Sequence, residues 1–388
     1  MYKRQLLLKG GRVIDPANNI DGNFDVAISG GHIALVGKDI ASAFARTVAD
    51  VSFLLLSRVL VDLHAHFYGY GGAILPDAHC LPEGTTTAVD AGGSGHLTFD
   101  DFNEQVIAPA TTNVFALLNI AGEGMVGEPE QDLDGMDPEL TAAKIAQRPD
   151  LIVGVKVAHY MGPGWEPLDR GIQAAEDTDV YLMVDQSPIQ TRPMDEMMLE
   201  HLRPGDMVTH CYALSKPMTD INDKVKQYFF DARERGVQFD VGHGAGSFSF
   251  RIAKAAIEQG FIPDTVSTDM HRSSILVNQA TMPETMSKLM ALGMELPDIV
   301  KRSTWDPAVA IGHTELGNLG QTQPADIAIL NIVEGEFGLV DNGTANRVYK
   351  ADKRIVCEMT VKNGQVVWDK NGLSRDDWSA SPPTNPAL

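Results

Sequence analysis

The sequence predicts a (β/α)8 TIM-like barrel joined to a small β-sandwich domain that is formed by both chain ends. From residue 59 to residue 308, short apolar runs without polar alternation are separated by longer helical stretches. This pattern is typical of a parallel sheet buried on both faces, and eight such runs fit one barrel. On either side of this region, short strands separated by glycine-containing turns indicate a β-domain.

Residues 1–58 form the first part of the predicted sandwich. Gly-Gly, Asp-Pro and Asp-Gly pairs favour turns between its short apolar segments. The expected strands are 6–8, 12–14, 25–28 and 32–36.

Residues 59–308 form the predicted (β/α)8 barrel, in which strands and helices alternate. The expected strands are 59–63, 85–90, 114–120, 152–157, 180–184, 207–210, 237–241 and 265–268. The expected helices are 98–107, 139–147, 171–176, 194–202, 220–235, 249–259 and 283–292. Because barrel active sites lie at the carboxyl ends of the strands, polar residues at those ends are candidates for catalysis.

Residues 309–370 return to strands and form the second part of the predicted sandwich. The expected strands are 326–331, 356–361 and 365–368, and the Lys-Asn-Gly turn at 362–364 predicts a hairpin. Residues 371–388 end in a segment rich in serine and proline, which predicts a mobile tail.

Composition narrows the classes of partner. The formal net charge of −21 disfavours nucleic acid and anionic membrane surfaces, since both require basic patches. The three cysteines are far apart and form no CxxC pair, which argues against a disulfide framework and against a cysteine zinc site. We find no apolar run long enough for a signal peptide or a membrane span, and we expect a cytoplasmic protein.

Several predicted strands end in a group that can bind metal or titrate. These groups are His64 with His66, Lys156, Asp185, His210, His243 and Asp269. His64 and His66 are two residues apart on a strand, so their side chains share one face, and imidazole nitrogens suit zinc. An isolated pair of this kind is as well explained by two structural histidines. The other strand-end ligands favour metal.

Lys156 ends a valine-rich strand that should be buried. A lysine there must either pair with a carboxylate or have its pKa lowered by desolvation. A neutral amine can react with carbon dioxide to form a carbamate, whose two oxygens could bridge two metal ions.

His64-Ala-His66, Lys156, His210 and Asp269 resemble the metal set of the amidohydrolase superfamily. GTTTAVDAG (84–92), LRPGDMVTH (202–210), VGHGAGSFSF (241–250) and STDMH (267–271) resemble its dihydroorotase-like amidohydrolase/deacetylase branch. RVIDP (12–16), PADIAIL (324–330) and VKNGQVVW (361–368) resemble the sandwich segments of the same family. The resemblance covers most of the chain.

The resemblance implies two divalent metal ions, with zinc favoured and manganese as an alternative. His64, His66 and Asp269 would hold one ion, His210 would help to hold the other, and a carboxylated Lys156 would bridge them. A metal-bridging hydroxide would then attack a carbonyl, and Asp269 would act as the general base.

The chain departs from the family pattern at Asp185, where most carbamate-bridged relatives have a histidine. Asp185 could bind metal itself, or it could orient His210. In the second case His159, three residues after Lys156, could supply the missing nitrogen.

Four further residues are candidates for contacts with a small-molecule substrate. His243 lies between glycines that let a ligand approach the backbone. His271 and Arg272 could pair with a substrate carboxylate, and Tyr160 could line the pocket.

The expected activity is hydrolysis of an amide bond in an N-acyl amino acid or a cyclic amide. An esterase that acts on an acylated hydroxy acid with the same site is one alternative. A noncatalytic, metal-stabilised barrel that serves as a binding or partner subunit is another. A homo-oligomer is compatible with either enzyme.

Overall fold

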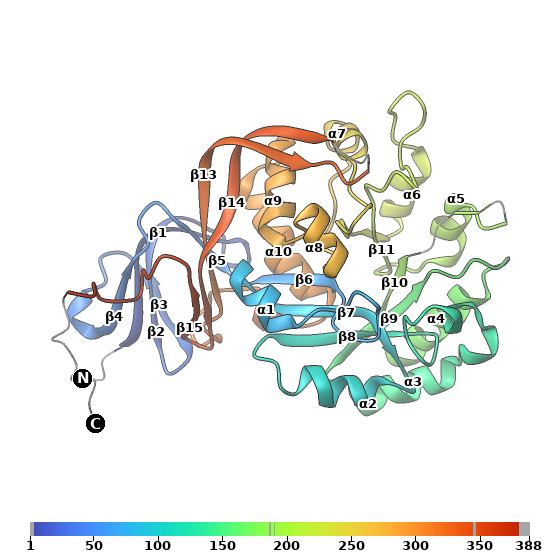
Figure 1. Cartoon of the computed structure of the whole chain (residues 1–388), viewed down its shortest axis with the longest axis horizontal. Coiled ribbons are helices and arrows are strands. Elements are labelled where there is room, and N and C mark those ends of the chain that lie inside the picture. Colours follow the sequence, from blue (N-terminus) through green and yellow to red (C-terminus); the bar gives the residue numbers. More distant parts are fainter. Residues whose placement is uncertain (1–3, 186–187, 190, 344–346, 380–388) are drawn as a thin grey trace.

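The computed structural model describes residues 4–185, 188–189, 191–343 and 347–379. A curled parallel sheet of seven strands forms its centre (Figure 1). The strands are β6 (Leu60–Ala65), β7 (Thr85–Gly95), β8 (Asn113–Asn119), β9 (Ile152–Ala158), β10 (Tyr181–Asp185), β11 (Met207–Val208) and β12 (Gln238–Phe239). They lie side by side in chain order, and each corresponds to a predicted strand. All residues of β6, β7 and β9 are buried, as expected for a sheet covered on both faces.

The expected eighth strand, 265–268, is not assigned as a strand within the described residues. Isolated parallel bridges instead join Thr265 to Asp240 and Met270 to Ala65, so this segment contacts both edges of the sheet. Its amide groups have partners outside a regular ladder: Thr268 N donates to the Asp62 carboxylate at 3.0 Å. The expectation of a regular strand was therefore wrong in form, although the segment lies where the eighth strand was expected.

Helices lie against the sheet and follow its strands in sequence (Figure 1). They are α1 (Pro76–Cys80), α2 (Phe99–Phe102), α3 (Pro138–Gln147), α4 (Glu166–Thr178), α5 (Met194–Glu196), α6 (Gln227–Glu234), α7 (Phe250–Glu258), α8 (Arg272–Asn278), α9 (Met282–Ala291) and α10 (Leu296–Ala310). Two π-helical turns, Asn103–Ile107 and Met197–His201, continue α2 and α5. The sequence did not predict α8 or α10. In α10, Pro297 lies in the first turn, where its missing N–H needs no partner, and Pro307 lies near the end.

A second sheet contains strands from both ends of the chain. The order is β15-β14-β13-β5-β1-β2-β3, and β4 pairs with β1. The strands are β1 (Arg4–Asp15), β2 (Ile20–Ser29), β3 (His32–Gly37), β4 (Ala45–Asp50), β5 (Leu55–Arg58), β13 (Ile327–Val340), β14 (Val348–Lys362) and β15 (Gln365–Asp369). The predicted turn joins β14 to β15, and Asn363 and Gly364 there have φ angles of 48° and 74°. The outer part of the predicted tail, 380–388, lies outside the described residues.

The β13–β14 hairpin is much longer than the sequence predicted. The two strands pair from Ile327–Val361 out to Val340–Val348, with irregularities on the way. The hairpin rises from the second sheet and arches over α9 toward α7 (Figure 1). Two hydrophobic clusters fill the region of the parallel sheet and its helices, and a separate cluster fills the second sheet. Among the described residues, no helix is long and apolar enough to cross a membrane.

Candidate metal centre

The carboxyl edge of the parallel sheet brings the predicted strand-end residues together. His64 lies in β6, Lys156 in β9 and Asp185 at the end of β10. His210 follows β11 by two residues, and Asp269 lies in the segment that bridges to β6. Because the strands are parallel and adjacent, residues far apart in sequence meet at one edge.

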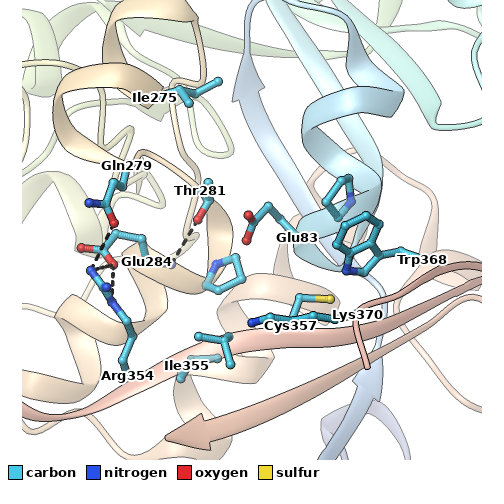
Figure 2. A pocket seen from close by; sticks show the side chains of 13 residues that line it. Glu83, Ile275, Gln279, Thr281, Glu284, Arg354, Ile355, Cys357, Trp368 and Lys370 are labelled. Carbon is cyan, nitrogen blue, oxygen red and sulfur yellow. Dashed lines mark hydrogen bonds and ion pairs between the residues drawn. The ribbon is translucent and has the colours of Figure 1, made fainter. Parts of the chain in front are cut away.

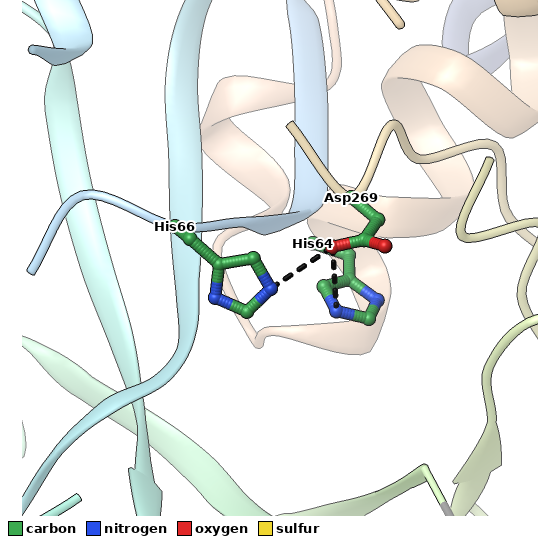
Figure 3. Close-up of side chains that lie close together, drawn as sticks. All are labelled: His64, His66 and Asp269. Carbon is green, nitrogen blue, oxygen red and sulfur yellow. Dashed lines mark ion pairs between the residues drawn. The ribbon is translucent and has the colours of Figure 1, made fainter. Parts of the chain in front are cut away.

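His64, His66 and Asp269 form a compact group of potential ligand atoms. One such atom from each side chain lies within 4.8 Å of the others, and all three residues are buried (Figure 3). Asp269 Oδ1 is 2.9 Å from His66 Nε2 and 3.7 Å from His64 Nε2. Two imidazole nitrogens and one carboxylate oxygen are a ligand set that zinc accepts.

A second group adjoins the first through His210. His210 Nε2 is 4.0 Å from Asp269 Oδ2 and 3.0 Å from Asp185 Oδ2. The other oxygen of Asp185 is 2.7 Å from Lys216 Nζ. His159 Nε2 is 3.6 Å from Asp185 Oδ2, and its Nδ1 is 3.2 Å from Glu130. Asp185 and His159, the two alternatives for the second metal shell, are therefore both present at this point.

Lys156 is fully buried beneath these groups. Its Nζ is 3.3 Å from His64 Nε2 and 3.6 Å from Met183 Sδ. Within the described part of the chain it forms no ion pair with a carboxylate. Gly92 gives the lysine stem room, since a Cβ at that position would lie 2.6 Å from Lys156 Cγ. The structure thus contains a buried amine without the carboxylate partner that a purely structural lysine requires.

Three residues of the centre have backbone conformations that side-chain-bearing residues rarely adopt. The φ angles of His159, His210 and Asp269 are 57°, 62° and 47°. Gly244, also at positive φ, lies so close to Asp269 that a Cβ there would overlap the carboxylate. Left-handed residues cost of order 1 kcal/mol or more each and cluster at functional sites.

Burial and charge act together on the titrating groups. Burial raises the pKa of Asp185, but His210 and Lys216 outweigh it and hold that pKa well below its usual range. Burial also acts to raise the pKa of Asp269. The opposing effects of His64, His271 and His66 are larger and hold that pKa well below its usual range. Burial lowers the pKa of Lys156 and moves the pKa of His64 well below its usual value. The carboxylates therefore stay anionic while His64 stays neutral, as metal ligands must be.

The hydrogen bonds of His210 test whether a cation fits between these groups. His210 Nδ1 is 2.6 Å from the carbonyl oxygen of Gly242, which can only accept, so Nδ1 must donate. In the neutral ring the lone pair on Nε2 then faces Asp185 Oδ2 at 3.0 Å. Two acceptors at that distance need a proton or a cation between them. The donor set therefore fits metal ions.

The candidate substrate residues are not all in one place. A cavity of about 290 Å³ lies at the centre, and its walls include His66, His159, Asp185, His210, Asp269 and His271. His271 Nδ1 is 2.8 Å from the Asp269 carbonyl oxygen.

The structure places the other three candidates outside the lining of this cavity. His243 is fully buried, with Nε2 at 2.5 Å from Lys288 Nζ. Tyr160 is buried below the guanidinium of Arg192. Arg272 is exposed, and its guanidinium is 3.4 Å from the carbonyl oxygen of Gly71.

Sequence reasoning missed Lys216, Glu130 and Tyr70. Lys216 and Tyr70 line the cavity, and Glu130 binds His159. Lys216 follows His210 by six residues and Tyr70 follows His66 by four, so position after a strand end was an available signal. Glu130 lies in a short 3-10 helix between β8 and α3, where no pattern marked it.

The chain is similar to known proteins over most of its length. No family model matches the chain. A deacetylase of Brucella anthropi is 32% identical over 334 residues, which are 82% of this chain and 82% of the relative. The crystal structure of an adenine deaminase matches with a TM-score of 0.85 at 28% identity, covering 95% of this chain and 100% of that one. That of a dihydroorotase matches with a TM-score of 0.84 at 29% identity, covering 94% and 99%.

The chain belongs to the amidohydrolase superfamily, in its dihydroorotase-like branch. It is an enzyme that hydrolyses C–N bonds other than peptide bonds. This excludes the noncatalytic barrel that the sequence left open.

Proposed function

We propose that the chain is a binuclear metallohydrolase that cleaves the amide bond of an N-acyl amino acid or a cyclic amide. The observation that carries the proposal is the convergence of His64, His66, His210 and Asp269 on one buried edge, with Lys156 directly beneath. The match to a deacetylase over 82% of both chains favours an acylated amine over a cyclic amide.

Two divalent cations, zinc by preference, would polarise the substrate carbonyl and lower the pKa of a water molecule in the cavity. His64, His66 and Asp269 would hold one of them. His210 would help to hold the other, with Asp185 as a further ligand or as the group that orients His210. Lys156, as a carbamate, would stand between the two sites.

Side chains of the protein transfer the proton and hold the carboxylates in position. Asp269 takes the proton of the attacking water and passes it to the leaving nitrogen. His271, whose ring contacts Asp269 and lines the cavity, holds that carboxylate in place. Lys216 neutralises one oxygen of Asp185 and leaves the other toward His210.

We further propose the domain boundaries 59–308 for the barrel and 1–58 with 309–370 for the sandwich. Parallel bridges from residues 240 and 65 support residues 265–270 as the eighth position of the barrel. The pairing of β5 with both β1 and β13 supports a single domain from both chain ends.

Metal analysis and one substitution test the activity. The purified protein should contain about two divalent ions per chain. Asp269→Asn should lower kcat on an N-acetyl amino acid by at least about 10²-fold. The exposed Asp195→Asn should leave kcat unchanged, as a matched control. Less than about half an equivalent of metal, or full activity of Asp269→Asn, would overturn the proposal.

A 13C spectrum tests separately whether Lys156 carries a carbamate. Protein prepared with 13C-labelled bicarbonate should show a carbamate carbon signal that Lys156→Met removes. A wild-type spectrum without that signal would exclude the bridging carbamate.

A further inference from the structure

Asp240 is a buried carboxylate that the proposed mechanism does not use. It follows β12 directly, is fully buried, and accepts hydrogen bonds from three hydroxyl groups. Thr265 Oγ1 donates at 2.7 Å, Ser267 Oγ at 2.6 Å and Thr209 Oγ1 at 2.8 Å. Three converging hydroxyl donors are the environment of an acceptor, so these hydroxyl hydrogens point toward Asp240.

Thr209 connects this carboxylate to the metal centre. Its Oγ1 is also 2.9 Å from His64 Nδ1. Because the hydroxyl hydrogen is committed to Asp240, Oγ1 can only accept from the imidazole. His64 must therefore carry its proton on Nδ1.

The opposite side of the His64 ring agrees with this assignment. Nε2 is 3.3 Å from Lys156 Nζ and 3.7 Å from Asp269 Oδ1, on the side where the ligand atoms converge. A ring protonated on Nδ1 presents its lone pair on Nε2, which is the form that binds a cation.

We propose that Asp240, acting through the Thr209 hydroxyl, fixes the Nδ1–H tautomer of His64 and aims its Nε2 lone pair at the metal centre. Both are positioning residues, since neither touches the cavity. Asp240 orients the hydroxyl, and the hydroxyl orients the ring. Partners of this kind hold a ligating histidine in one tautomer and raise its basicity. The inference deepens the metal site proposed above, and its binding readout rests on that site.

The three hydroxyls around Asp240 supply a matched pair of variants. Thr209→Val removes the hydroxyl that touches His64. Thr265→Val removes a hydroxyl that bonds the same carboxylate but has no hydrogen bond to a histidine. Both threonines are fully or nearly fully buried, so the two variants lose a comparable buried bond.

Zinc affinity, measured by competition with a chromophoric chelator, is the first readout. Thr209→Val should bind zinc about 10- to 100-fold more weakly than wild type. Thr209→Ser should restore the affinity, and Thr265→Val should keep it. Wild-type affinity in Thr209→Val, or an equal loss in Thr265→Val, would overturn the proposal.

The tautomer itself is the second readout and does not depend on metal. In 15N-histidine-labelled, zinc-free protein, the His64 resonances, assigned with His64→Gln, should show a protonated Nδ1. Thr209→Val should populate the other tautomer, and Thr265→Val should not. If wild type binds no zinc, the metal proposal fails, while these spectra still decide the role of Asp240. An Nε2–H tautomer in wild type would refute it.

Discussion

At the scale of single residues, the centre combines groups that are unfavourable one at a time. A lysine without a carboxylate partner, two acceptors face to face and three left-handed residues lie within one small region. Each would destabilise an ordinary core. Their concentration at one edge indicates that the fold maintains them for chemistry.

Glu83 is a half-buried carboxyl outside the centre, and its ionisation should affect stability. It ends the short helix Leu81–Glu83 and points into a pocket shared with Glu284 and Lys370 (Figure 2). Burial raises the pKa of Glu83 from 4.5 to about 7, against an opposing effect of Lys370. Between those values the folded protein binds the proton more tightly than the unfolded chain does. Stability contributed by protonation is therefore lost as the pH rises from 4.5 to 7.

Glu83→Gln removes this loss, because an amide does not ionise. At pH 8 the variant should unfold with a free energy about 1–3 kcal/mol higher than wild type, and the difference should shrink toward pH 4. Denaturant titrations at several pH values measure it. The exposed Glu104→Gln should show no such trend. A difference for Glu83→Gln that does not change with pH would contradict the expected ionisation.

The sequence predicted which strand-end residues lie together better than it predicted their surroundings. His64, His66, His210 and Asp269 could be identified because strand ends are local features and barrel topology brings them to one edge. His243 also stands after a strand, yet its ring turns away to Lys288. Which way a side chain points depends on packing from distant segments, and one sequence does not encode that locally.

At the scale of elements, the features that the sequence did not predict also depend on contacts between distant segments. Seven strands follow directly from apolar runs. The segment 265–268 is irregular because the Thr268 amide donates to the Asp62 carboxylate and the Val266 amide donates to the Arg302 carbonyl oxygen. The β13–β14 hairpin extends beyond its predicted length because its outer half packs on α9, a contact invisible in sequence.

The outer end of that hairpin supports the loop beside Asp269. Asn342 Nδ2 donates to the carbonyl oxygens of Gly244 at 2.8 Å and His243 at 3.1 Å. Lys288 Nζ joins Asn342 Oδ1 at 3.0 Å and the Val340 carbonyl oxygen at 2.6 Å. Since Gly244 packs against the Asp269 carboxylate, the hairpin holds this loop at its place in the active site.

Asn342→Ala should therefore impair catalysis without emptying the metal site. We expect kcat to fall by about tenfold or more, since small misplacements of catalytic groups are costly. Hydrogen exchange at residues 242–248 should accelerate, while the metal content should stay at the wild-type level. Asn331→Ala, which lies within β13 and is bonded to Glu358, is the control and should keep kcat. Unchanged exchange in Asn342→Ala would show that the hairpin does not support the loop.

At the scale of the whole molecule, the excess of acidic residues contrasts with a few buried cations at the junction of the two sheets. Arg58 is fully buried between them, with Nε at 2.7 Å from the Leu316 carbonyl oxygen and Nη2 at 2.9 Å from that of Glu315. Burial lowers the pKa of Arg58 to about 10, against the attraction of Asp326. These contacts join the 3-10 turn Thr314–Leu316, which follows α10, to the second sheet.

Asp326 is the centre of this junction. Its Oδ2 is 2.9 Å from Lys362 Nζ and accepts from Thr86 Oγ1 of β7 at 3.0 Å. Its Oδ1 accepts from the amide of Asn363 at 2.6 Å. One carboxylate thus links the β14–β15 hairpin to the parallel sheet, and the side chains of the Asp326–Lys362 pair are only 1% and 5% exposed.

A double-mutant cycle should show that this pair stabilises the junction, and two probes of unfolding should show that the two sheets unfold as one unit. Asp326→Asn and Lys362→Met should each lower the free energy of unfolding by about 3–5 kcal/mol, because each leaves its partner buried and unpaired. The double variant should lose less than the sum of the two, by about 1–3 kcal/mol. Lys353→Met, which breaks an exposed 3.7 Å pair with Glu334, should cost less than about 1 kcal/mol. Denaturant unfolding followed by fluorescence and by metal release should give coincident transitions in wild type. Separate transitions there would mean that the two sheets do not unfold as one unit. Additive losses in the double variant would mean that Asp326 and Lys362 do not stabilise each other.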